Sequence, residues 1–93
     1  MSYTFTYTKS FSRDVKLMSK RKYNMKELTD LLEQLRDGNP LPEKYHDHQL
    51  KGSMKQFREC HIAPDWLLLY LKDRKNLILT LVRTGSHADL LNK

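Results

Sequence analysis

Hydrophobic and polar positions alternate in the first residues of the chain. Tyr3, Phe5 and Tyr7 are separated by threonines. A period of two is typical of a strand that buries one of its faces, and aromatic and β-branched residues favour strands. We therefore expect an N-terminal strand over residues 3–7.

Two helical patterns follow this strand and predict a helical hairpin. In the first, Ser10 can serve as the N-cap, and one side of the helix is set by four residues at a spacing of 3.6: Phe11, Val15, Met18 and Lys22. The second begins after the N-cap Asn24 and ends before Gly38. Its inward positions are apolar: Met25, Leu28, Leu31, Leu32 and Leu35.

The second half of the chain predicts a connection followed by strands. Glycine and proline residues break regular structure after Gly38, and a long loop continues to about Gly52. Apolar or mixed segments at 54–62, 66–71 and 77–82 then indicate three strands. The expected fold is α+β: an N-terminal strand, a helical hairpin and a three-stranded antiparallel meander, with the helices on one face of the sheet.

Length and composition limit the protein to one domain over residues 1–93. With 93 residues and 39% hydrophobic content, the chain can bury one modest core. It has no apolar run of the roughly 18 residues that a membrane span needs, and its polar start lacks a secretory signal, so we expect a cytoplasmic protein without membrane contact. The single cysteine, Cys60, is interpreted as a small strand residue.

Charge changes this picture by indicating polyanionic partners. The formal net charge is +6 and the pI is near 9.6, and lysine and arginine release counterions when they neutralise phosphates. The first helix carries a basic stripe opposite its apolar side: Lys9, Arg13, Lys16 and Lys20. This stripe is either an RNA-binding face or an ordinary solvated helix face.

The meander brings several reactive side chains to one edge of the sheet. The end of its first strand, the start of the second and the end of the third place His61, Asp65 and Arg83 together, and His87 follows closely enough to fold back to them. His48 precedes the first strand at its opposite end, so only the loop could deliver it to this edge.

These residue types suit the cleavage of RNA. The reaction needs a base for the 2′-hydroxyl, an acid for the departing 5′-oxygen and a cation for the phosphorane. Histidine serves as acid or base near neutrality, Asp65 could act as a base or orient an imidazole, and Arg83 offers a planar fork to two phosphate oxygens. Each residue also has a structural alternative: a strand histidine, a turn cap, a surface ion pair and a loop residue.

Two further features have more than one interpretation. His46 and His48 form an HxH pair that a metal site could use, although the chain lacks a second tight ligand pair. Trp66, at a strand start, is favoured as a core residue, but beside a phosphate site it could stack on a base.

Motifs in this order closely resemble those of the YafQ-like toxins of the RelE superfamily. The matching segments are FSRDVK at 11–16, YHDHQLKGS at 45–53, FRECHIAPDW at 57–66 and RTGSH at 83–87. They contain DHxLxGS, RxxHxxPDW and RTGxH, which are specific in combination. The resemblance covers nearly the whole chain and implies a RelE-like α+β fold.

The resemblance implies a ribosome-dependent endoribonuclease that cuts messenger RNA in the ribosomal A site without a metal or other cofactor, leaving a 2′,3′-cyclic phosphate and a 5′-hydroxyl. Five positions correspond to the catalytic set: His48, His61, Asp65, Arg83 and His87. His87 is favoured as general acid and Asp65 or His48 as base, with Arg83 stabilising the phosphate and Trp66 supporting the site.

The same resemblance predicts the partners and one departure. An acidic antitoxin of DinJ type is expected to wrap the toxin and to bind operator DNA itself, while the basic stripe suits ribosomal (16S) RNA or that antitoxin. Leu91 stands where the family has an aromatic residue four positions after the last histidine, so a substrate-binding role at this position would be altered.

Two other classes compete with a nuclease. ParE-like relatives share the architecture but inhibit gyrase by protein contact, and they have no need for three histidines, an aspartate and an arginine in register with a nuclease motif. A DNA-binding protein in its own right would need a helix-turn-helix signature, which the sequence lacks.

Overall fold

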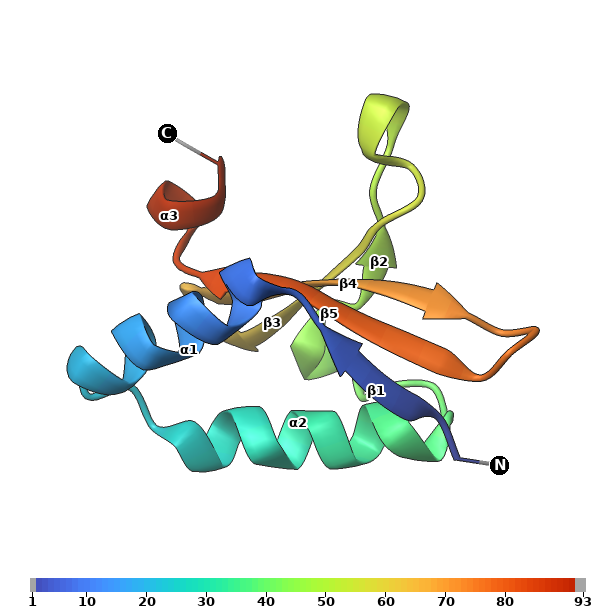
Figure 1. The fold of residues 1–93 in the computed structure, drawn as a ribbon, viewed down its shortest axis with the longest axis horizontal. Helices are drawn as coiled ribbons and strands as arrows, with labels where there is room; N and C mark the ends of the chain where they lie inside the picture. Colours follow the sequence, from blue (N-terminus) through green and yellow to red (C-terminus); the bar gives the residue numbers. More distant parts are fainter. Residues whose placement is uncertain (1, 92–93) are drawn as a thin grey trace.

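The computed structural model describes the backbone of residues 2–91 and the side chains of residues 2–90 (Figure 1). Its regular elements are β1 (Thr4–Tyr7), α1 (Lys9–Lys20), α2 (Met25–Asp37), η1 (Glu43–Tyr45), β2 (His48–Gln49), η2 (Gly52–Met54), β3 (Arg58–Ala63), β4 (Trp66–Asp73), β5 (Ile78–Gly85) and α3 (His87–Leu91). Within this part of the chain, none of the helices has the length and apolar character to cross a membrane.

The expected meander is present and forms the centre of a larger sheet. The sheet has five strands in the order β1-β5-β4-β3-β2. β3, β4 and β5 are antiparallel neighbours, as the sequence predicts, whereas β1 pairs in parallel with β5. The short β2 extends the other side of the sheet by pairing with β3.

The hydrophobic core lies between the sheet and the two long helices. In Figure 1, α2 runs beneath the sheet, while α3 lies above it. The helices contribute buried residues at the expected spacing: Phe11, Met18, Leu28, Leu31 and Leu35. Trp66, Leu68 and Tyr70 meet them from alternate positions of β4, as one face of a strand must. The α+β fold with α1 and α2 on one face is confirmed.

The N-terminus of α1 differs from the prediction. Thr8, not Ser10, is the N-cap: its Oγ1 accepts a hydrogen bond from the backbone N–H of Phe11 at 2.9 Å and donates one to the carbonyl of Val82 at 2.7 Å. α1 therefore begins directly after β1, and Ser10 lies inside its first turn. Lys22, expected on the apolar side, lies beyond the helix with a positive φ of 64°, and Asp14 is buried instead.

The assignment of this cap is testable by a pair of alanine substitutions. Thr8→Ala removes the cap and the bond to Val82, so it should lower the free energy of unfolding by about 1–2 kcal/mol. Ser10→Ala is the matched control and should change it by less than about 0.5 kcal/mol, as expected of a surface position. Urea unfolding measures both, and equal losses in the two variants would contradict the Thr8 cap.

The ends of α2 agree with the prediction. The side chain of Asn24 accepts a hydrogen bond from the backbone N–H of Lys26 at 3.1 Å. Gly38 follows the helix in the left-handed region, with φ 80°, a conformation that a residue without Cβ adopts easily. The helical hairpin is thus confirmed at its second helix.

The long connection after α2 contains structure that the sequence did not predict. It holds η1, η2 and the two-residue strand β2, and β3 begins at Arg58 rather than near Met54. Two residues are too few to show a period-two pattern, which explains why β2 was missed. Because β2 covers only Arg58 and Glu59, the rest of β3 has no strand on that side.

Candidate active site

His61 lies on the face of the sheet that points away from the main core. Its neighbours in β3, Cys60 and Ile62, belong to the core cluster, so alternation turns His61 outward. It pairs in register with Leu67, which is fully buried but outside that cluster. Partial burial and the charge of His46 both lower the pKa of His61, which favours its neutral form at neutral pH.

The other three histidines of the chain lie around His61. The ring centroids of His61 and His87 are 5.7 Å apart, and those of His61 and His46 are 5.2 Å apart. His48 pairs with Glu59, two residues before His61 and therefore on the same face of the sheet. The sequence placed His61 and His87 together but counted His46 only as a metal-ligand candidate.

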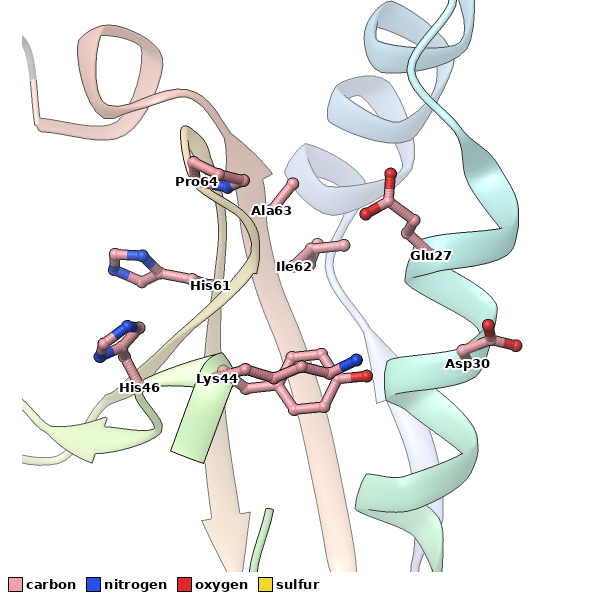
Figure 2. A pocket seen from close by; sticks show the side chains of 9 residues that line it. Glu27, Asp30, Lys44, His46, His61, Ile62, Ala63 and Pro64 are labelled. Carbon is pink, nitrogen blue, oxygen red and sulfur yellow. The ribbon is translucent and has the colours of Figure 1, made fainter. Parts of the chain in front are cut away.

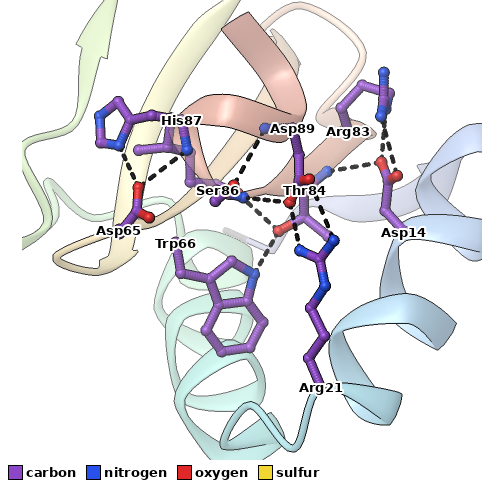
Figure 3. Close-up of polar contacts among 10 residues, drawn as sticks. Asp14, Arg21, Asp65, Trp66, Arg83, Thr84, Ser86, His87 and Asp89 are labelled. Atoms are coloured by element: carbon purple, nitrogen blue, oxygen red, sulfur yellow. Dashed lines mark hydrogen bonds and ion pairs between the residues drawn. The ribbon is translucent and has the colours of Figure 1, made fainter. Parts of the chain in front are cut away.

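His87 is held by Asp65 (Figure 3). Oδ1 of Asp65 accepts a hydrogen bond from the backbone N–H of His87 at 3.0 Å and lies 2.6 Å from its Nδ1. These two hydrogen bonds, first the backbone one, lower the pKa of Asp65. Because an ionised carboxylate only accepts hydrogen bonds, Nδ1 of His87 carries the hydrogen and Nε2 is left for other partners.

α3, which carries His87 at its first position, is a short helix that the sequence did not predict. Ser86 and Asp89 cap it reciprocally: the backbone N–H of Asp89 donates to Ser86 Oγ at 3.1 Å, and that of Ser86 donates to Asp89 Oδ2 at 3.0 Å. This is the capping-box pattern, and its spacing in the sequence could have revealed the helix. Arg21, after α1, donates to Asp89 at 2.8 Å, and this bond leads the contacts that lower the Asp89 pKa to about 2.

Arg83 lies further from the edge than predicted. It pairs with Leu69, two residue pairs inside the Leu67–Gly85 pair, because β5 continues to Gly85. Arg83 donates hydrogen bonds to the carboxylate of Asp14, from Nε at 2.6 Å and from Nη2 at 3.1 Å. Figure 3 shows this ion pair on the α1 side of the site, away from Asp65 and His87. The ion-pair alternative thus describes its contacts, and 39% of the Arg83 side chain stays accessible.

Trp66 is a core residue. Only 1% of it is exposed, its indole N–H donates to Thr84 Oγ1 at 2.9 Å, and its ring meets that of Tyr23 edge to face at 5.0 Å. A buried ring cannot stack on a base, so the stacking interpretation is wrong. Trp66 directly follows Asp65 in the sequence, and its side chain contacts Thr84 near the end of β5, the strand that leads into His87.

The connection between α2 and β3 brings His48 to the site, in agreement with the expectation that only this loop could do so. In β2 its Nε2 lies 3.5 Å from Glu59 Oε1, and its Nδ1 lies 2.7 Å from the carbonyl oxygen of His46. About half of its side chain is exposed. The neighbouring Asp47 anchors this segment, because it accepts hydrogen bonds from Tyr70 Oη at 2.5 Å and from Arg58 Nη2 at 3.0 Å.

A cavity of about 570 Å³ opens beside the histidines (Figure 2). It lies between α2 and η1, on the side of β3 opposite β4, where β2 does not extend along the strand. Ile62, Ala63 and Tyr45 supply its apolar lining, with Glu27 and Asp30 on the α2 side. His46 and His61 form the opposite side, so both rings are accessible from this space.

The structure also locates the basic stripe and Cys60, the other positions that the sequence singled out. The basic stripe lies on α1, and each of its members is exposed: Lys9, Arg13, Lys16 and Lys20. Cys60 is fully buried in β3, and burial raises the pKa of its thiol, in keeping with a structural role. In residues 2–91 no group of three or more His, Cys, Asp or Glu side chains is arranged to hold a metal ion. The side chain of Leu91 lies outside the described part of the structure.

Known proteins similar to this chain agree in sequence and in fold. Residues 3–92 match the family model described as a bacterial toxin of a type II toxin-antitoxin system, YafQ. The mRNA interferase toxin YafQ of Escherichia coli K12 is 44% identical over 85 residues, which are 90% of each chain.

Solved structures give the same result. The E. coli DinJ-YafQ toxin-antitoxin complex contains a chain that matches with a TM-score of 0.88 at 40% identity, covering 97% of this chain and 98% of that one. A metal-bound toxin from Helicobacter pylori matches with a TM-score of 0.86 at 41% identity, covering 97% and 99%.

Proposed function

Because this chain belongs to the YafQ family of bacterial toxins of type II toxin-antitoxin systems, we propose that it is an mRNA interferase, a ribosome-dependent endoribonuclease that cleaves messenger RNA in the ribosomal A site and inhibits translation. The observation that carries this proposal is the row of imidazoles beside a carboxylate-held His87. The similar E. coli protein is named for the same activity.

The proposed reaction is metal-independent transfer of the phosphate to the ribose 2′-oxygen. His61, whose lowered pKa favours the neutral imidazole, takes the proton of the 2′-hydroxyl, and the 2′-oxygen then bonds to phosphorus. The bond from phosphorus to the 5′-oxygen breaks as protonated His87 donates the hydrogen on Nε2. The products are a 2′,3′-cyclic phosphate and a 5′-hydroxyl.

We infer the roles of Asp65 and His48 from their contacts. Asp65 orients His87 and stabilises its charged form, since its Oδ1 is already engaged by His87; it is therefore better suited to orienting than to acting as the base. His48 is half exposed on the same face as His61, which supports a proposed contact with a phosphate of the substrate.

Arg83 and Trp66 are proposed to support catalysis in different ways. Arg83 offers the accessible part of its guanidinium to a phosphate on the α1 side, while Asp14 fixes its orientation. Trp66 contacts no substrate and instead keeps the end of β5, and thus His87, in position. A substrate contact of Leu91 remains a prediction.

The exposed basic stripe of α1 is proposed to bind ribosomal RNA. Lys16→Glu combined with Lys20→Glu should weaken binding to the ribosome and reduce its dependence on salt, because fewer counterions are released. Binding measured between 50 and 200 mM salt checks this. Arg74→Glu with Lys75→Glu, in the exposed β4–β5 turn, changes the net charge equally, and an equal loss in this control would contradict a specific α1 surface.

The proposed protein partner is an acidic antitoxin of DinJ type. The similar E. coli toxin forms a complex with DinJ, and the net charge of +6 in this chain favours an acidic partner. Operator DNA would be bound through the antitoxin.

Primer extension on a defined messenger tests the nuclease function. In a reconstituted translation system, discrete cuts should occur within A-site codons only when ribosomes are present, and EDTA should leave cleavage of a nucleotide analogue unchanged. An intact messenger under conditions in which the protein still stops growth would overturn the proposal. Inhibition of gyrase by protein contact, as in ParE-like toxins, would then be the alternative to test.

A further inference from the structure

His46 is the histidine that the proposed reaction leaves without a role. Its ring lies beside that of His61, with 5.2 Å between the centroids and 52° between the planes. His87 contacts the same ring edge to face at 5.7 Å. In Figure 2, His46 lies below His61. His61 is thus the shared neighbour of two other imidazoles.

The position of His46 is fixed by its neighbours in the chain. It follows η1 with a positive φ of 49°, which is uncommon for a residue with a Cβ. The next residue, Asp47, is held by the fully buried Tyr70 and by Arg58. Because this anchor lies one residue away, His46 belongs to a braced segment rather than to a free loop.

A substrate can reach both rings. His46 and His61 line the same cavity of about 570 Å³, and the His46 side chain is exposed while His61 is partly buried. Water therefore stabilises a charge at the position of His46 better than one at the position of His61.

We propose that His46 is a positioning residue of this active site that acts through His61: as an imidazolium it repels a second proton from the neighbouring ring and so keeps His61 ready to act as the base. This inference rests on the proposed nuclease function. Two like charges about 5 Å apart that are screened as in bulk water shift each other's titration by roughly half a pH unit.

Other charged groups act on His61 as well. From the elements around it they are His48, Glu59 and His87, with Lys44, Glu27 and Asp30 lining the shared cavity and Asp65 bound to His87. Glu59 favours a proton on His61 and opposes the three histidines. After burial, His46 contributes most to the lowered pKa of His61.

NMR titration of the histidine ring resonances in the free protein tests the pairing of these rings. His46→Asn removes the charge with a residue that tolerates a positive φ, and the midpoint of His61 should rise by about half a pH unit. His46→Lys keeps the charge and should leave the midpoint low. Lys44→Gln is the control, because it removes a cation that lines the same cavity, whereas the ring contact with His61 is made by His46.

Single-turnover cleavage on the ribosome tests the catalytic role. In His46→Asn the acidic limb of the pH profile should move upward with the NMR midpoint, which lowers the rate about twofold to threefold below pH 6 and little at pH 8. An unchanged His61 midpoint, or an equal shift in Lys44→Gln, would overturn the inference. If the midpoint moves but the unsubstituted protein cuts no messenger, the nuclease function fails and the pairing of the rings stands without a catalytic role.

Discussion

His87→Ala should lower the single-turnover rate of messenger cleavage on the ribosome by about 10²–10⁴-fold, the usual contribution of a general acid. The substitution removes the imidazole that Asp65 orients in this site, while the hydrogen bond from the backbone N–H of residue 87 to Asp65 can persist. Toxicity in growing cells should be lost accordingly.

The fold should survive this substitution. Nearly half of the His87 side chain is exposed, and α3 is capped by Ser86 and Asp89 rather than by His87. The free energy of unfolding, measured with urea, should therefore change by less than about 1 kcal/mol. Antitoxin binding should be retained. A folded variant that cleaves at the full rate would show that His87 is not the acid.

Asp65→Asn separates orientation from proton donation at the same site. The amide can still accept from the backbone N–H, but it no longer stabilises a charged His87, so the rate should fall while the protein stays folded. A smaller loss than in His87→Ala is expected, since the donor itself remains. The two variants together test the acid and its support.

Sequence patterns predicted the elements that have clear periodicity. α2 is an example: its apolar spacing, Asn24 and Gly38 determine its face and both ends. The meander could be predicted equally well, because β4 and β5 are long, largely apolar segments on either side of a polar turn. Their adjacency then placed His61, Asp65 and His87 near one edge.

The parts that were missed depend on pairing between distant segments. β2 is too short to show a pattern, so the approach of His46 and His48 to His61 depends on the β2–β3 register. The HxH spacing was the available signal that both rings could reach one site, although His46 precedes β2 in the left-handed region rather than in extended chain. Asp14 was missed because a charged residue in a helix is ordinarily solvated, and only the contact with β5 explains its burial.

Asp14→Ala should cause a large loss of stability, about 3 kcal/mol in the free energy of unfolding. The carboxylate accepts hydrogen bonds from Arg83 and from the buried backbone N–H of Thr84, the latter at 3.1 Å. β1 pairs with β5 only as far as Leu81, so Asp14 takes the place of a strand for the last part of β5. Without it, the Thr84 N–H has no partner in a site that excludes water.

The Thr84 bond should account for more of this loss than the ion pair does. Arg83 is 39% exposed, so water can replace much of its interaction with Asp14. Asp14→Asn should therefore lose less stability than Asp14→Ala, because its amide oxygen can still accept from Thr84. Asp30→Ala breaks the exposed pair with Lys26 and should cost less than about 0.5 kcal/mol.

Urea and thermal unfolding decide between these possibilities. A loss of about 3 kcal/mol corresponds to a fall in Tm on the order of 15 °C for a domain of this size. Equal losses in Asp14→Ala and Asp30→Ala would contradict the role of Asp14 as the partner of the β5 edge. Because β5 leads directly into His87, a confirmed loss would also link the contact between α1 and β5 to the strand that precedes the proposed general acid.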